Sequence, residues 1–416
     1  MTQINNEQYF DTLKENVLNQ DSNLQSAMNK AYEQFKTLGI PTKKHEDWKY
    51  TNISHFLTEK LTLAQKSNST LSSNYPFEYK IVFQNGIFNE EKSSLPNGVS
   101  LSTNLESTQG IESNLNDHLD LMNLSALQSI IKISVDKNIN VNSPIAIIHL
   151  SDNGSSKSLE ASRIIINAQK LSKVNFLEIF NTTEDSQAIQ TSVTKLFLEQ
   201  AAIVNHIKCN LINKNSMHLG KVYSKVSRDA TLNTFTFTVG GGLSRNNIEV
   251  DLEEENATSN VHGLFALKEN DHCDNFSTIR HNAARTYSNQ LFKGILDNDS
   301  HGIFTGKIVV QRDSQEVDST QLNKNLLLSK KAHIDTRPQL EVYADDVKCA
   351  HGATIGQISQ EEAFYLQSRG ISLDRARVIL AHAFSMEALE KIENEQIREY
   401  LTNLLFEKFE TKALGI

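Results

Sequence analysis

The stretch Leu232-Asn-Thr-Phe-Thr-Phe-Thr-Val239, followed by Gly240-Gly-Gly242 and then Ile248-Glu-Val-Asp-Leu252, alternates apolar with polar side chains. A period of two is typical of a half-buried β-strand, and glycines between two such runs indicate a turn. A phosphate-binding loop is the weaker interpretation, because the Lys-Ser/Thr pair of a Walker motif is missing. The stretch therefore predicts strands that follow one another closely.

Similar strand-like runs extend on both sides of this stretch, from about residue 142 to residue 345. Asn, Asp, Ser and Gly fill the gaps, and no long helical pattern interrupts them. About 200 residues of short strands without crossover helices predict a sandwich, a barrel or a β-solenoid, and the periodicity alone does not choose among the three. The clearest runs are Ile145-Ala-Ile-Ile148, Ile164-Ile-Ile166, Val174-Asn-Phe176, Leu196-Phe-Leu198, Leu264-Phe-Ala266, Ile308-Val-Val310 and Leu340-Glu-Val-Tyr343.

The N-terminal part of the chain has a different pattern. Residues 7 to 38 carry apolar positions at helical spacing, and Gly39 and Pro41 then end the helix. Residues 78 to 102 indicate short strands with a turn at Asn85-Gly86, and residues 113 to 132 indicate a further helix. The segment Lys43 to Thr51 holds the only tryptophan, and we expect its aromatic rings to pack against the body of the protein.

The chain turns helical again after Gly356. Ser359-x-x-Glu362 is a capping box, and Ser372 can cap a second helix whose residues Ala376, Ile379, Ala383, Met386 and Leu389 lie along one face. We therefore expect three regions, which are an N-terminal helical region with a few strands (1–140), a β core (141–357) and a C-terminal helical domain (358–416).

Composition narrows the class of protein. The 416 residues carry a net charge of −9 and only 38% of them are hydrophobic, which favours an elongated or repeat-built fold over one deep core. No long basic stretch is present, so nucleic acid is not expected as a partner. No cationic N-terminal segment leads into an apolar run, and no apolar run approaches the length of a bilayer span. These features predict a cytoplasmic protein without a membrane partner.

Cysteine usage points to one candidate site. Cys209, Cys273 and Cys349 lie far apart without a CxxC pair, so neither a disulfide framework nor a self-contained zinc finger is supported. Cys349 lies two positions before His351, and on a strand such residues point to the same face. A thiolate beside an imidazole suits iron, zinc and iron–sulfur clusters. From the residues alone, however, a buried structural cysteine beside a hydrogen-bonded histidine is the better interpretation.

Other candidate motifs are weaker. Asp271-His272-Cys273-Asp274, with His281 further on, is the densest set of metal-ligand types, but solvated turn residues explain it more simply than zinc or iron. The glycines of His301-Gly-Ile-Phe-Thr-Gly-Lys307 do not have P-loop spacing, so no nucleotide site is predicted in this chain. No Gly-x-Ser-x-Gly or His-Glu-x-x-His motif of hydrolases is present either.

Several segments taken together resemble one family. They are His45-Glu-Asp-Trp-Lys-Tyr-Thr51, Asp318-Ser-Thr-Gln-Leu-Asn-Lys-Asn-Leu-Leu-Leu-Ser329, His333-Ile-Asp-Thr-Arg-Pro-Gln-Leu-Glu341 and Asp346-Val-Lys-Cys-Ala-His-Gly-Ala-Thr-Ile-Gly-Gln357. These segments are similar to those of the SufB/SufD family, in its SufD form, whose members are scaffold subunits of the SUF iron–sulfur cluster assembly system.

The resemblance implies a right-handed parallel β-helix flanked by N-terminal and C-terminal helical regions. It implies a scaffold that is not an enzyme, that pairs with SufB or with a second copy of itself as a homodimer, and that receives the ATPase SufC on its C-terminal helices in a SufBCD complex. Cys349 and His351 match family residues at the SufB–SufD interface, where iron or a nascent iron–sulfur cluster is held transiently. His272 and His281 have family counterparts and are interpreted first as solenoid structure.

Two other interpretations stay open. A parallel β-helix could belong to an intracellular carbohydrate-active enzyme, although no carboxylate pair for such chemistry can be chosen from the sequence. The chain could also be a purely structural subunit that supplies no ligand. The sequence does not decide whether the isolated chain dimerises, or whether metal, flavin or a cluster is bound at rest.

Overall fold

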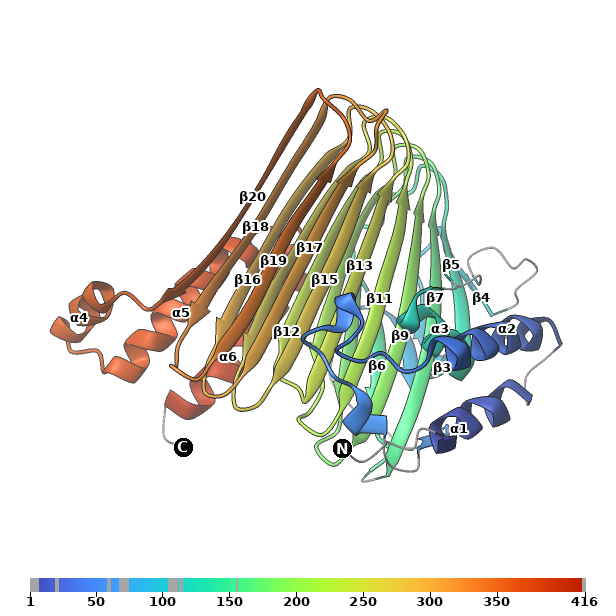
Figure 1. The fold of residues 1–416 in the computed structure, drawn as a ribbon, viewed down its shortest axis with the longest axis horizontal. Helices are drawn as coiled ribbons and strands as arrows, with labels where there is room; N and C mark the ends of the chain where they lie inside the picture. Colours follow the sequence, from blue (N-terminus) through green and yellow to red (C-terminus); the bar gives the residue numbers. More distant parts are fainter. Residues whose placement is uncertain are drawn as a thin grey trace.

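Two long parallel sheets wound from one chain form the body of the protein (Figure 1). The structure is a computed structural model that describes residues 7–18, 22–57, 61–66, 75–103, 111, 114, 116–154 and 156–413. Each sheet contains ten strands within those residues. From the middle of the chain onward, successive strands alternate between the sheets, so every turn of the solenoid adds one strand to each.

The first sheet, here called sheet A, follows the order β19-β17-β15-β13-β11-β9-β7-β5-β4, with β1 pairing beside β7. Its strands are parallel to one another except at the β4–β5 pair. The strands are β1 (Thr62–Leu63), β4 (Val99–Ser102), β5 (Ser129–Val135), β7 (Lys157–Ala168), β9 (Gln187–Leu198), β11 (Met217–Val226), β13 (Leu243–Leu252), β15 (His272–His281), β17 (His301–Val310) and β19 (His333–Val342).

The second sheet, here called sheet B, follows the order β20-β18-β16-β14-β12-β10-β8-β6-β2-β3. Its strands are β2 (Tyr79–Gln84), β3 (Ile87–Ser94), β6 (Ile145–Ser151), β8 (Lys173–Thr182), β10 (Ile203–Leu211), β12 (Thr231–Val239), β14 (Thr258–Leu267), β16 (Tyr287–Leu296), β18 (Val317–Leu327) and β20 (Val347–Gln357).

The register confirms a parallel β-helix and excludes the sandwich and the barrel. Ile203 pairs with Thr231, and Thr231 pairs with Thr258, so these two turns take 28 and 27 residues. All the strand pairs from β5 to β20 are parallel, whereas sandwiches and up-and-down barrels are antiparallel. Side chains on the inner faces stack in columns, such as Val250, Ile279 and Ile308 on β13, β15 and β17, all fully buried. Burial of such columns, rather than sequence symmetry, holds the turns together.

The N-terminal region packs on the outer face of sheet A, over β7, β9 and β11. It contains α1 (Glu7–Leu18), α2 (Ser22–Leu38), the 3-10 turns η1 (Glu46–Trp48) and η2 (Ser54–Leu57), and α3 (His118–Ala126). The single helix expected over 7–38 is therefore two helices. The helix expected over 113–132 is shorter, since β5 begins at Ser129. The predicted turn is confirmed, because Asn85 and Gly86 both adopt positive φ between β2 and β3.

The C-terminal helices cover the outer face of sheet B. They are α4 (Gln360–Ser368), α5 (Leu373–Leu389) and α6 (Glu395–Ala413), and Ser359 and Ser372 cap α4 and α5 as predicted. α5 contacts β14 and β16, α6 contacts β12, and α4 extends away from the sheets (Figure 1). Of the residues predicted to lie along one face of α5, Ile379 and Ala383 are exposed. The buried positions are Ala376, Ala381, Ser385, Ala388 and Leu389. Within the described residues, no helix has the length and apolar character needed to cross a bilayer.

Candidate functional site at the open end of the solenoid

Strand β20 is the last strand of sheet B, and it carries the predicted pair Cys349 and His351. One edge of β20 pairs with β18 along its whole length, and its other edge has no strand partner among the described residues. Most of β20 is exposed, whereas β18 alternates between buried and exposed positions. An eleven-residue strand with one free edge is a ready-made surface for pairing with another chain.

Cys349 and His351 occupy inner-face positions of the solenoid. In register they lie over Ser319 and Gln321 of β18, and both of those side chains are fully buried. Asp318 and Leu322, which alternate with them, point outward and are exposed. Aligned residues in parallel strands project to the same side, so the same inner column that is covered at β18 is uncovered at β20. Cys349 is half-buried and His351 is exposed because no further solenoid turn follows among the residues described.

The inner columns below this pair are polar. Ser319 Oγ lies 2.7 Å from Ser288 Oγ, and Gln321 Nε2 donates to Gln290 Oε1 at 2.5 Å. Gln290 Nε2 in turn donates to Ser277 Oγ at 2.5 Å. These side chains are buried, so their hydrogen bonds fix the positions directly beneath Cys349 and His351. These ladders were not predicted, because their members lie half a turn or a full turn of the solenoid apart in the sequence.

Burial controls the protonation of the three thiols. Burial raises the pKa of Cys349 above its ordinary value, and the nearby carboxylate of Asp318 adds to the shift. Cys209 and Cys273 are fully buried; burial raises the pKa of Cys273 to about 12 and that of Cys209 even further. Cys349 is therefore the cysteine of this chain that a solvent-borne metal can reach.

The second candidate, residues 271 to 281, does not form one site. Strand alternation on β15 sends Cys273 and His281 inward and His272 and Asp274 outward. Inside, the two ring nitrogens of His281 lie 2.7 Å from Thr286 Oγ1 and 2.9 Å from Ser288 Oγ, which supports the structural interpretation. Outside, His272 Nε2 lies 3.0 Å from the hydroxyl of Thr51.

The N-terminal segment lies along this outer face of sheet A. Trp48 is buried as predicted, and the guanidinium carbon of Arg245 lies 3.9 Å from its ring centroid. Thr51 Oγ1 donates to Asp274 Oδ2 at 2.5 Å, and Glu46 pairs with Arg337 at 2.9 Å. A polar cavity of about 260 Å³ is lined by Trp48 of this segment, by His118 of α3 and by Arg245 of the sheet, among other residues. The cavity is lined by both acidic and basic side chains, so its charge does not indicate which class of ligand would bind there.

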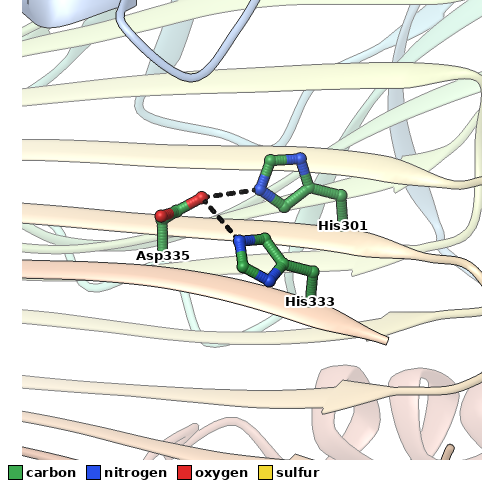
Figure 2. Close-up of side chains that lie close together, drawn as sticks. All are labelled: His301, His333 and Asp335. Carbon is green, nitrogen blue, oxygen red and sulfur yellow. Dashed lines mark hydrogen bonds and ion pairs between the residues drawn. The ribbon is translucent and has the colours of Figure 1, made fainter. Parts of the chain in front are cut away.

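One side-chain cluster on the same face was missed by the sequence reasoning. His301 pairs in register with His272 on one side and with His333 on the other, and Asp335 lies two positions after His333. Figure 2 shows the rings of His301 and His333 both directed at the carboxylate of Asp335. The available signal was the spacing of the three histidines, 29 and 32 residues, which equals one solenoid turn at each step.

The fold and its uncovered last turn define a parallel β-solenoid protein that presents a thiol and an imidazole at one end. A family model described as "SUF system FeS cluster assembly, SufBD core domain" matches residues 149–384, and one described as "SufBD protein N-terminal region" matches residues 3–103. The chain belongs to the SufBD family of iron–sulfur cluster assembly proteins.

Individual relatives agree with this assignment. The chain is 28% identical to the iron–sulfur cluster assembly protein SufD of Escherichia coli over 376 residues, which cover 88% of this chain and 89% of the relative. It is also 28% identical to an iron–sulfur cluster assembly SufBD family protein of Synechocystis over 400 residues, which cover 90% and 88% of the two chains. Both alignments extend over the solenoid and beyond it.

Proposed function

We propose that this chain is a non-catalytic scaffold subunit that helps to form a nascent iron–sulfur cluster, or to acquire iron, at an interface with a SufB-like paralogue. Cys349 and His351 are the ligands that this chain supplies. The observation that carries the proposal is their place on the inner face of the uncovered last turn, where a second solenoid end can meet them. Family membership supplies the cargo, which is iron and sulfide.

The chemistry of the pair suits a transient ligand set. Two same-face residues on a strand lie about 6.6 Å apart along its axis, so a thiolate and an imidazole can approach one metal centre together. Because burial raises the pKa of Cys349, the thiol is protonated at neutral pH and loses its proton when metal binds. Cys209 and Cys273 are buried, so the remaining ligands of a cluster come from the partner.

The free edge of β20 supports pairing with another solenoid. Its unpaired backbone groups can extend a sheet across an interface, and Tyr343 and Ile355 add exposed apolar surface at the same end. A SufB-like chain, which shares the family fold, is the expected partner. When that partner is absent, a second copy of this chain can pair through the same edge as a homodimer.

The C-terminal helices support docking of a SufC-like ATPase. α4 packs on α5 and projects from the body, with Phe364 71% exposed and Tyr365 also exposed. α5 is fastened to sheet B by Glu387, which accepts from Lys293 at 2.6 Å and from Lys324 at 2.8 Å. Motion of an ATPase bound at α4 would therefore reach β16 and β18, which support β20. The sequence offers no nucleotide motif of its own, so hydrolysis falls to the partner.

Coexpression with a SufB-like paralogue and a SufC-like ATPase tests the proposal. We expect a stable complex that gains iron and acid-labile sulfide, and we expect His351→Ala and Cys349→Ser to lower the cluster yield while the complex still assembles. Lys348→Ala is the matched control, since Lys348 neighbours the pair on β20 but points outward. Full cluster formation by the Cys349→Ser/His351→Ala double variant would show that this chain supplies no ligand and acts only as a structural subunit. Failure to bind either partner would refute the scaffold role itself.

A further inference from the structure

The outer face of sheet A carries a second set of metal-ligand side chains, away from Cys349 and His351. His301 lies on β17, and His333 and Asp335 lie on β19. Strand alternation places all three outward, whereas Cys349 and His351 belong to sheet B and face inward. The two sets therefore cannot share one ion. Neither the family match nor the interface proposed above requires the outer set.

The three side chains converge on one point. His301 Nε2 lies 2.8 Å from Asp335 Oδ2, and His333 Nε2 lies 3.3 Å from the same oxygen (Figure 2). One ligand atom from each residue lies within 4.8 Å of the others. Ligand atoms around a tetrahedral ion with 2.1 Å bonds are roughly 3.4 Å apart, so the most widely separated ligand atoms need to approach by up to about 1.4 Å. His333 is 66% exposed and free to make that movement.

Contacts with neighbouring rings hold His301, the less exposed of the two histidines, in place. The ring centroid of His301 lies 4.9 Å from that of His272 and 5.0 Å from that of His333. His272 does not compete for Asp335, because its Nε2 lies against the hydroxyl of Thr51. Parallel register keeps His301 and His333 side by side, about 4.8 Å apart along the sheet. The ligands are thus mounted on rigid strands, which favours a preformed site.

We propose that His301, His333 and Asp335 bind a divalent first-row transition-metal ion on the outer face of sheet A. Two imidazoles and one carboxylate, without a thiolate, suit ions such as Fe²⁺, Co²⁺ and Zn²⁺. Three protein ligands leave coordination positions for water, and the exposed side of His333 opens the site to solvent. The site is therefore exchangeable, unlike a closed structural zinc site. It does not depend on the function proposed for Cys349 and His351.

The test is metal binding by the full chain, stripped of metal and studied without partners. Co²⁺ alone is titrated while the visible d–d absorption is recorded, and Zn²⁺ alone is titrated by calorimetry. We expect one ion per chain, with binding weakened at least tenfold by His333→Ala and by Asp335→Asn. Because His333 is exposed and Asn keeps the shape of Asp335, neither variant should unfold the protein, and circular dichroism checks this.

Two controls separate this site from the alternatives. Asp299→Asn removes an exposed carboxylate from the turn before β17, where Asp299 pairs with Lys331, and should leave binding unchanged. The Cys349→Ser/His351→Ala variant should also retain the ion, which distinguishes this site from the open end. Equal affinity in wild type, His333→Ala and Asp335→Asn would overturn the proposal, as would no binding of either ion by the wild type at millimolar concentration. Binding lost only in the Cys349→Ser/His351→Ala variant would overturn it too.

Discussion

Gly306 on β17 provides the space that the glutamine ladder under His351 requires. A Cβ atom built at position 306 would lie 2.3 Å from Gln321 Nε2 and 2.8 Å from Gln290 Oε1. Both glutamines are buried and hydrogen-bonded to each other, so neither can move aside without breaking the ladder. Gly306→Ala is therefore expected to destabilise the last turns and to displace the support of His351.

The expected magnitude follows from two contributions. Forcing an extra methyl group into a packed interior costs about 1–3 kcal/mol, and loss of the buried amide hydrogen bond adds about 1 kcal/mol. The free energy of local opening should therefore fall by about 2–4 kcal/mol. Since each 1.4 kcal/mol is about a factor of ten, amide exchange should accelerate roughly thirty-fold to several-hundred-fold.

Hydrogen–deuterium exchange measured by mass spectrometry can locate this effect. Peptides from β16 to β20 should exchange faster in Gly306→Ala, and peptides from β7 to β9 should not change, because solenoid turns contact only their neighbours. Gly356→Ala is the matched control, since a Cβ atom at Gly356 meets nothing within 4 Å. Exchange within threefold of wild type at β16 and β18 would refute the reasoning, as would an equal effect of the control.

Three further predictions concern protonation, thiol access and the C-terminal helices. Burial raises the pKa of Glu160 from 4.5 to about 7, so between these pH values the native state holds a proton that the unfolded state has lost. The contribution of the protonated Glu160 to the free energy of unfolding is therefore complete below pH 4.5, and up to about 3 kcal/mol of stability is lost as the pH rises through 7. The Tm of wild type minus that of Glu160→Gln should therefore fall from pH 4.5 to pH 8, and a constant difference would contradict this. In native protein a thiol reagent should modify Cys349 alone, with the other two cysteines reacting only after unfolding; mass spectrometry of labelled peptides measures this, and no label should remain in native Cys349→Ser. Glu387→Gln should loosen α5 from sheet B, because two lysine partners lose their carboxylate, and limited proteolysis should cut near α5 sooner than in wild type.

Local features of the fold were predictable because each depends on a few adjacent residues. Alternation in Leu232–Val239 predicted a strand, Asn85-Gly86 predicted a turn, and Ser359 and Ser372 predicted helix starts. The break between α1 and α2 was missed because the apolar spacing continues across it. The helix predicted over 113–132 was too long because the apolar run Ser129–Val135 serves equally well as a strand, and only the pairing with β7 decides between them.

The sequence by itself determined the strand-rich core, the helical ends and the same-face spacing of Cys349 and His351, since these follow from chemistry within a few residues. Only the tertiary structure decided which residues one turn apart stack on each other, because the register depends on the length of every intervening turn. That register placed Gln321 beneath His351 and aligned His301 with His333. It also left the column of Cys349 uncovered, because β20 is the last strand of sheet B in the part of the chain that the structure describes.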